Sequence, residues 1–264
     1  MLEAAAAFDF GGTVYFMLEL ENLKKSFDNK LVLNNINLKI RNREIVSVFG
    51  PPGSGKSTLL NLIQGLITGD CGRILLDGKD ITSVAQEERQ VNIVFRDFDF
   101  VWDWSVYKNI TYPLKERPVS TMSEVNSLIQ FMGLDSLLTQ KLIQISGEDR
   151  LKVALVKTMT MRPKALLLDE PFRFLTRSGS DSVRQCIRDI LRYYNICALV
   201  TGSRYEDVCS FSDRVFCLKE GILTPFQELN DSSRTSRRHL FVKRHSKNPR
   251  PPIDSETKSV RRNM

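Results

Sequence analysis

Long hydrophobic runs are missing from this sequence of 264 residues. No segment approaches the roughly 18 uninterrupted apolar residues that a membrane-spanning helix needs. Residues 1–16 are apolar, but they lack the basic start of a secretion signal, and Asp9 and the Gly11-Gly12 pair interrupt them. We interpret residues 1–16 as an N-terminal extension, with Met17 as an alternative start. The composition, 42% hydrophobic and 26% charged, is typical of a soluble globular protein.

Paired cysteines and centrally placed histidines are missing as well. The five cysteines form no C-x-x-C pair and have no regular spacing. This pattern indicates reduced thiols in a cytosolic protein rather than a disulfide framework or a zinc site. The two histidines, His239 and His245, both lie near the C-terminus. Residues 17–228 therefore offer no histidine for catalysis.

Acidic residues are scarce near the C-terminus. Residues 231–264 hold ten basic and three acidic residues, an excess of seven that equals the net charge of the whole chain, so the remainder is neutral. Pro249, Pro251 and Pro252 punctuate this polar segment. A basic tail can contact anionic lipid or nucleic acid, but a solvated, flexible end is the simpler interpretation. We expect residues 229–264 to be a basic flexible tail, with no specific nucleic-acid partner.

A glycine-rich segment follows the apolar run 46–49 and opens a segment of helical composition. It matches the pattern G-x-x-x-x-G-K-[ST]. Its residues are Gly50, Pro51, Pro52, Gly53, Ser54, Gly55, Lys56, Ser57 and Thr58. Strand, glycine loop and helix in this order predict a P-loop, in which backbone N–H groups and a helix N-terminus bind phosphate. Lys56 would neutralise the β- and γ-phosphates, and the Ser57 hydroxyl would coordinate Mg²⁺.

A second, independent motif is an apolar run that ends in two acids. Residues 165–168 read Ala-Leu-Leu-Leu, and Asp169 and Glu170 follow. A buried strand delivers such residues to the carboxyl edge of a parallel sheet, where ligands bind. Asp169 would hold Mg²⁺ through water, and Glu170 would orient or deprotonate the attacking water. We predict that Glu170 and Lys56 are the catalytic residues.

Strand-like and helical segments alternate along residues 17–228. Before the P-loop, segments 16–20 and 31–40 alternate like antiparallel strands. Later strand-like runs are 73–76, 91–95, 165–168, 198–201 and 214–218, and helical ones are 123–131, 148–159, 181–194 and 206–211. This alternation predicts an α/β fold. We expect a P-loop NTPase core with an N-terminal antiparallel β subdomain and an inserted helical subdomain at 97–160.

Together these motifs make residues 17–228 similar to the ATP-binding subunit of an ABC transporter. Ile145-Ser146-Gly147-Glu148-Asp149 lies where that family carries its L-S-G-G-Q signature, and Asp169-Glu170-Pro171-Phe172 matches its D-E-P-F stretch. The resemblance implies that Ser146 and Gly147 contact ATP held by a second subunit. It also implies that Phe27 stacks on the adenine, although a core position is an equal alternative for this residue.

Four positions depart from the family pattern. Arg96 replaces the glutamine that senses the γ-phosphate, and Glu148 replaces the second glycine of the signature. Thr176 replaces the aspartate of the dimer interface, and Gly202 replaces the switch histidine. Glu148 and Asp149 would place two carboxylates near the partner's phosphate, and the repulsion would weaken ATP capture. The same acids favour a helix start, and with Ser146 they resemble a capping box.

The resemblance implies a function in transport, with ATP and Mg²⁺ as cofactors. The partners would be transmembrane permease subunits, a second ATPase subunit in a homo- or heterodimer, and a solute-binding protein. The location would be peripheral, on the cytoplasmic side of the inner membrane. A short helical insert without a long C-terminal regulatory domain resembles importers, including those of the nitrate, sulfonate and taurine group.

Two functional interpretations follow from the motif residues that are present and those that are replaced. In the first, the chain is an ABC-type ATPase with weakened hydrolysis. In the second, it is a degenerate ATP-binding partner or regulator, and another subunit performs the turnover. A third class, a nucleic-acid-handling ATPase, rests on the basic tail alone.

Aromatic residues are concentrated just after Arg96. Phe98, Phe100, Trp102 and Trp104 alternate with Asp99, Val101 and Asp103. In the family this region faces the membrane subunit, and Trp is enriched at interface hot spots. The segment is therefore a candidate docking surface, with a buried strand of the helical subdomain as the alternative.

Overall fold

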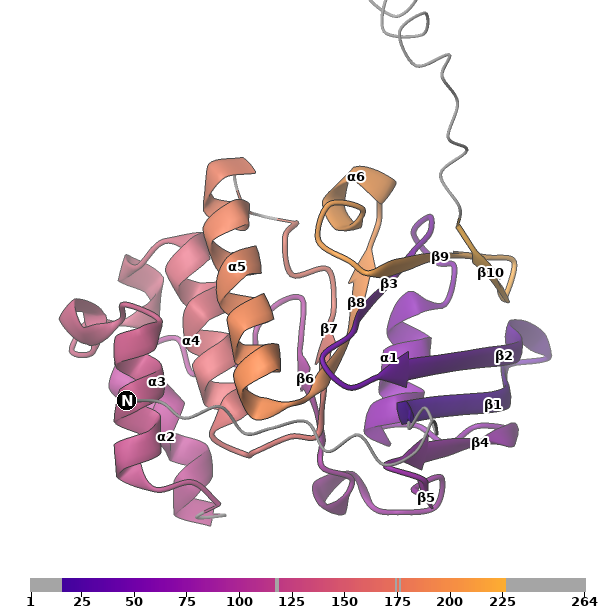
Figure 1. The fold of residues 1–264 in the computed structure, drawn as a ribbon, viewed down its shortest axis with the longest axis horizontal. Coiled ribbons are helices and arrows are strands. Elements are labelled where there is room, and N and C mark those ends of the chain that lie inside the picture. Colours follow the sequence, from indigo (N-terminus) through magenta and orange to yellow (C-terminus); the bar gives the residue numbers. More distant parts are fainter. Residues whose placement is uncertain (1–15, 117–118, 174, 176, 227–264) are drawn as a thin grey trace, which may run out of the picture. The chain divides into compact units, whose positions relative to one another are not determined.

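A computed structural model describes residues 16–116, 119–173, 175 and 177–226 (Figure 1). The described residues all belong to one compact unit. The predicted extension, apart from Phe16, and the predicted tail at 229–264 lie outside the described residues, as does Thr176. Within the described ranges, no helix combines the length and the apolar character needed to cross a membrane.

An antiparallel sheet of four strands has the order β2-β1-β4-β5. The strands are β1 (Phe16–Phe27), β2 (Lys30–Arg41), β4 (Cys71–Leu76) and β5 (Lys79–Asp80). Asp28 and Asn29 join β1 to β2 at φ 45° and 62°, the backbone that a tight two-residue hairpin requires. The predicted strand at 73–76 forms, but it pairs with β1 in this sheet rather than joining the parallel core.

The second sheet has six strands in the order β10-β9-β3-β8-β7-β6. They are β3 (Ile45–Phe49), β6 (Val91–Val94), β7 (Ala165–Leu168), β8 (Cys197–Gly202), β9 (Arg214–Lys219) and β10 (Ile222–Pro225). All neighbours pair in parallel except β10, an antiparallel edge strand that the sequence did not predict. The register sets Val94 beside Leu168, Leu168 beside Val200, and Phe49 beside Gly202. Four strands therefore end at one edge.

Successive residues of the six-stranded sheet are buried in two different cores, as the two-residue period of a strand requires. Leu167 and Leu199 pack toward the antiparallel sheet. Leu166, Leu168 and Val200 pack on the opposite face. A strand that is covered on both faces shows a continuous apolar run instead of alternation, which explains the sequence of β7.

Helices pack in both cores, on opposite faces of the six-stranded sheet (Figure 1). Helix α1 (Lys56–Gln64) packs in the first core, together with residues of both sheets. Helices α2 (Val106–Glu116), α3 (Met122–Phe131), α4 (Gly147–Met159) and α5 (Arg177–Tyr194) cover the opposite face. Helix α6 (Tyr205–Val208) follows β8 and is shorter than the predicted 206–211. Three single 3₁₀ turns occur at Gln86–Glu88, Asp135–Leu137 and Leu142–Gln144.

The aromatic segment after Arg96 is not a strand. Residues 97–104 are irregular chain with a turn at 102–103, and Ser105 makes an isolated bridge to Lys141. The alternative of a buried strand is therefore wrong. Alternating aromatic residues also occur in irregular chain, where their rings pack on one another. The Phe100 ring stacks on Phe98 at 5.4 Å and meets the edge of Trp102 at 5.9 Å. Trp102 remains 41% exposed.

Arg89 joins the C-terminal end of α1 to the loop before β6. Its side chain is 4% exposed, and it donates hydrogen bonds of 2.7–3.0 Å to the carbonyls of Leu62, Ile63, Thr82 and Val84. Two of these carbonyls belong to the last turn of α1, whose terminal C=O groups have no partner within the helix. This contact holds the far end of the helix that begins at the P-loop.

Replacing Arg89 with alanine should lower the free energy of unfolding by about 3 kcal/mol, because buried carbonyls lose their donors. Arg89→Lys should restore little of this stability, since an ammonium cannot reproduce the guanidinium fork. Urea denaturation followed by circular dichroism measures both. Arg73→Ala is the matched control, because Arg73 is 63% exposed and pairs only with Glu21 among the contacts described. Equal losses for Arg73→Ala and Arg89→Ala would contradict this role.

Candidate functional site

A cavity of about 700 Å³ opens at the edge where the four parallel strands end. The P-loop contributes Pro52, Gly53, Gly55 and the first residues of α1 to its wall. Arg96 lies two residues beyond β6, Glu170 two beyond β7, and Ser203 directly follows β8. The strand register thus brings together residues that are more than 100 positions apart in the chain.

Two glycines give the P-loop its shape. Gly53 and Gly55 have φ angles of 78° and 103°, which L side chains rarely adopt. A third glycine is required by space, because a Cβ on Gly50 would lie 2.2 Å from the carbonyl oxygen of Leu218. No heavy atom lies within 4 Å of the position that a Cβ on Gly53 would take. The loop is therefore tightly packed against β9 at Gly50 and open at Gly53.

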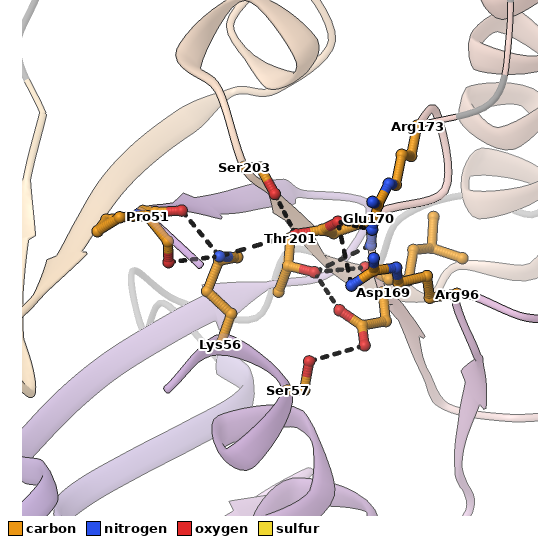
Figure 2. A network of polar contacts seen from close by, with 11 residues as sticks. Pro51, Lys56, Ser57, Arg96, Asp169, Glu170, Arg173, Thr201 and Ser203 are labelled. Carbon is orange, nitrogen blue, oxygen red and sulfur yellow. Dashed lines mark hydrogen bonds and ion pairs between the residues drawn. The ribbon is translucent and has the colours of Figure 1, made fainter. Parts of the chain in front are cut away.

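Lys56 points back into its own loop. Its ammonium donates hydrogen bonds to the carbonyls of Gly50 at 2.8 Å and Pro51 at 3.1 Å (Figure 2). Glu170 Oε1 lies 3.7 Å from the same nitrogen. Burial lowers the pKa of Lys56 from its ordinary value, while the carboxylates of Glu170 and Asp169 act in the opposite direction. The ammonium is thus partly desolvated, which strengthens its attraction for an anion.

Asp169 connects the P-loop helix to β8. Its Oδ2 accepts a hydrogen bond from Ser57 Oγ at 2.9 Å, and its Oδ1 accepts one from Thr201 Oγ1 at 2.7 Å. Thr201 Oγ1 also accepts the backbone N–H of Glu170 at 3.0 Å. Both acids after β7 are therefore positioned by one buried hydroxyl, which Figure 2 shows between them.

Glu170 has a partner at each carboxylate oxygen. Ser203 Oγ donates to Oε1, the oxygen that also faces Lys56. Oε2 lies 3.8 Å from Arg96 Nη1 and 3.6 Å from Arg173 Nη1. The Glu170 side chain is only 9% exposed, and its φ of 46° is rare for a residue with a side chain. Unusual backbone of this kind is concentrated at functional sites.

The side chains present fit Mg²⁺ and a polyphosphate. Ser54 Oγ, in the P-loop, is buried and has no hydrogen-bond partner among the described residues. Ser57 and Asp169 offer the hydroxyl and carboxylate oxygens that Mg²⁺ prefers. The described part of the chain contains no group of three or more His, Cys, Asp or Glu side chains that could hold a metal alone. This suits Mg²⁺, which takes most ligands from phosphate and water.

Phe27 lies at the end of β1, away from the described wall of the cavity. Its ring is 44% exposed, so the alternative of a core residue is wrong. The Lys25 ammonium lies 5.1 Å from the ring centroid. Val32 of β2 lines the cavity instead, and adenine stacking by Phe27 stays a prediction.

Ser146 and Gly147 are placed at the start of α4, and neither lines the cavity. Ser146 Oγ accepts the backbone N–H of Asp149 at 3.1 Å and donates to the Asp149 carboxylate at 2.6 Å. The expected cap is therefore present. Lys152 lies 2.9 Å from Glu148 and 4.0 Å from Asp149, which partly neutralises the two carboxylates that the sequence places in the signature.

The sequence did not indicate four of the residues that line the site. Thr201 and Ser203 flank Gly202 in the sequence, and two hydroxyls beside the position of the switch histidine are a signal of hydrogen bonding. Arg173 follows the D-E-P-F stretch, and no periodicity predicts that it reaches the Glu170 carboxylate. Arg204 also lines the cavity. The predicted Pro52 and Thr58 do line it, whereas Gly50 and Ser54 lie beneath the loop.

Comparison with known families finds that residues 33–173 match the model of the ABC transporter family. The sulfate/thiosulfate import ATP-binding protein CysA of Mannheimia succiniciproducens is 32% identical over 81% of this chain and 62% of its own length. The probable sulfate/thiosulfate import ATP-binding protein of Chlorella vulgaris is 31% identical over 80% and 92%. The spermidine/putrescine import ATP-binding protein PotA of Aliivibrio fischeri is 30% identical over 78% and 56%. The chain thus spans from 56% to 92% of these relatives.

Solved structures share the fold. An ATP-binding cassette of an ABC transporter in its ADP conformation superposes with a TM-score of 0.73 and 20% identity, over 86% of this chain and 98% of that one. The protein cbiO1 of Clostridium perfringens, part of an ABC transporter complex, gives 0.72 and 24% over 87% and 94%. At this identity the likeness concerns the fold alone. It agrees with the predicted P-loop NTPase core and its antiparallel β subdomain.

Replacing Thr201 with valine should lower the free energy of unfolding by about 2 kcal/mol, since a buried carboxylate and a buried N–H each lose a partner while the shape is kept. Thermal unfolding measures this. Thr224→Val is the matched control, because Thr224 is exposed and its hydroxyl makes only a 3.4 Å bond to Cys217. A Thr201→Val variant as stable as the wild type would contradict the proposed support of Asp169 and Glu170.

Proposed function

The chain belongs to the ABC transporter family, and we propose that it is the ATP-binding subunit of an importer, coupling ATP binding and hydrolysis to solute transport across the membrane. The observation that supports this function is the meeting of Lys56, Ser57 and the two acids after β7 at one cavity. Phosphoryl transfer depends on positioning and on charge stabilisation around phosphate. These four side chains supply both the positioning and the charge stabilisation.

In this proposal the P-loop binds the phosphates of ATP. Its open upper face presents backbone N–H groups, and the N-terminus of α1 adds a positive dipole end. Lys56 would exchange the carbonyls of Gly50 and Pro51 for phosphate oxygens. Ser57 and Asp169 would hold Mg²⁺, which supplies positive charge against the phosphates.

Glu170 is the proposed group that orients the attacking water and accepts its proton. Its backbone is held by Thr201, and its carboxylate is buried at the cavity wall. Hydrolysis requires that one carboxylate oxygen become accessible to water, because both oxygens face other partners in this structure. The rate of hydrolysis therefore depends on a rearrangement of these partners.

A degenerate ATP-binding partner or regulatory subunit is the second candidate function. Two observations favour it. Gly202 occupies the position of the switch histidine and presents no side chain to the cavity, and the Glu170 carboxylate is engaged on both sides. Loss of one group that stabilises a transition state lowers a rate about a hundredfold or more. In this case another subunit would perform the turnover.

The proposed partners are transmembrane permease subunits, a second ATPase subunit and a solute-binding protein, with the chain attached peripherally at the cytoplasmic side of the inner membrane. The exposed Trp102, with its neighbours Phe98 and Phe100, supports a permease contact. Arg150 lies over the Trp102 ring at 5.3 Å, and the cation helps to orient the ring. A nucleic-acid function rests on residues outside the described part of the chain.

The cargo follows from the permease and the solute-binding protein rather than from this chain. The relatives described above are named for sulfate, thiosulfate, spermidine and putrescine import. Uptake of nitrate, sulfonate or taurine stays a prediction, and genes for a permease and a binding protein beside this one would test it.

Purified protein should bind Mg-ATP and hydrolyse it, and Glu170→Gln should lower the turnover about a hundredfold or more while ATP stays bound. Lys56→Ala should lose ATP binding, because the phosphates lose their cation. Isothermal titration and phosphate release measure the two properties. Glu220→Gln is the control, because that carboxylate is 83% exposed and is not part of the described lining of the cavity. Equal, near-zero turnover of wild type and Glu170→Gln would favour the degenerate subunit, and absence of ATP binding would reject both candidates.

Trp102→Ala should release the chain from its permease, because a large exposed ring of an interface anchor is lost. Co-purification with the permease encoded nearby, after co-expression, measures the contact. Tyr193→Ala removes a ring that is 71% exposed on α5 and should leave the complex intact. Circular dichroism checks the fold of both variants. A folded Trp102→Ala variant that still co-purifies would contradict docking through this segment.

A further inference from the structure

Asn109 is a polar residue in an apolar core. It lies on α2 and is 2% exposed. Its neighbours Val106 and Ile110 are fully buried in the core that α2 shares with α4 (Figure 1). A buried amide costs free energy unless hydrogen bonds replace those that it made to water. The partners of this side chain therefore indicate what the residue does.

The Asn109 amide binds the backbone of the chain that leads into α2. Its Oδ1 accepts the Val101 N–H at 3.0 Å, and its Nδ2 donates to the Val101 carbonyl at 3.0 Å. Nδ2 also lies 3.1 Å from the carbonyl oxygen of Ser105 and 3.5 Å from that of Trp104. Each described hydrogen bond of this side chain thus ends on a peptide group of residues 101–105.

These contacts hold a β-turn that presents Trp102. The Trp104 N–H donates to the Val101 carbonyl at 3.0 Å, which is the hydrogen bond between the first and the fourth residue of a turn. Trp102 and Asp103 are the two central residues, and both are exposed. Because the buried Asn109 amide binds the first and the fourth residue, the turn is fixed from the core side and Trp102 stays at the surface.

A second anchor of the aromatic segment comes from α4. The Lys157 ammonium donates to the Asp99 carbonyl and lies 3.7 Å from the Asp99 carboxylate. The Lys157 side chain is 20% exposed. A charge-assisted hydrogen bond to a carbonyl fixes the backbone itself rather than a mobile side chain. The segment is therefore attached to α4 at residue 99 and to α2 at residues 101–105.

The two anchors supply order that regular structure does not. Residues 97–104 form neither helix nor strand, so side chains of the neighbouring helices hold this part of the chain. An exposed ring that is already held in one orientation loses less conformational freedom when a partner covers it. A fixed turn at Trp102 therefore favours binding through that ring.

We propose that Asn109 and Lys157 are positioning residues that hold Trp102 in the orientation in which it contacts the permease. This inference rests on the proposed function, in which the exposed Trp102 docks on the permease. The two side chains act through the backbone of residues 99–105 and make no contact with the partner themselves.

Tryptophan fluorescence measures the order of this segment directly, because Trp102 and Trp104 are the two tryptophans of the chain. Asn109→Leu keeps a side chain of similar size and removes its hydrogen bonds. Lys157→Met keeps the aliphatic stem and removes the ammonium. Each substitution should shift the emission to longer wavelength and raise the quenching by acrylamide, since the rings gain access to water when the turn is released.

The matched control is Asn37→Leu. The Asn37 amide also binds backbone at two points, the N–H of Asn22 at 3.0 Å and the carbonyl of Asn35 at 3.0 Å, but it lies in the antiparallel sheet. This variant should keep the emission and the quenching of the wild type. Thermal unfolding shows which variants are folded.

Affinity for the permease is the second measurement. The full chain is titrated with the detergent-solubilised permease encoded nearby. Asn109→Leu and Lys157→Met should each raise the dissociation constant about three- to tenfold, the effect of having to order one side chain on binding. The dissociation constant of Mg-ATP should change less than about twofold. In a Trp102→Ala background the same substitutions should weaken permease binding no further, because they act through that ring.

The outcomes separate this inference from the proposed function. Folded variants with the quenching or the permease affinity of the wild type would overturn the positioning role, and docking through Trp102 would stand. Further weakening in the Trp102→Ala background would overturn the role as well, because the anchors would then act elsewhere. If Asn109→Leu does not fold, Lys157→Met alone decides. If Trp102→Ala binds the permease as the wild type does, or the wild type does not bind it, the proposed docking fails and this inference fails with it.

Discussion

The parallel register among β6, β7, β8 and β3 is the constraint on which the site depends. It aligns Val94, Leu168 and Val200 across three strands and Phe49 beside Gly202. The chain that leaves each strand therefore enters the same small volume. Two apolar cores hold this register, because alternate residues of β7 and β8 are buried on opposite faces. A slip of one residue would exchange the faces of a strand and move its terminal residues away from the cavity.

The electrostatics of the site follow from this convergence. Asp169 is satisfied by two hydroxyls, whereas Glu170 is surrounded by Lys56, Arg96 and Arg173. The two adjacent acids thus have different environments although they share a strand end. A buried carboxylate needs such partners, and in turn it holds several cations together. The same arrangement that suits a polyanion restricts the access of water to Glu170.

The signature segment keeps its local structure although its sequence departs from the family pattern. Ser146 caps α4 as the sequence indicated, and Lys152 pairs with both Glu148 and Asp149. The acids therefore stabilise the start of the helix through its dipole and through ion pairs. Their repulsion of a partner's phosphate is smaller than the two bare charges imply. The substituted motif residues thus leave the start of α4 in place.

The sequence by itself determined the P-loop, the apolar strand before Asp169 and Glu170, and the cap of α4, because each is a local pattern whose backbone geometry requires particular residue types. It also predicted the exact bounds of β7, a fully apolar run. Only the tertiary structure decided that β4 pairs with β1 and that residues 97–104 are irregular chain. It also decided that Thr201, Ser203, Arg96 and Arg173 contact the acids. These contacts join side chains from strands far apart in the chain, and their distances follow from sheet register, which no local pattern records.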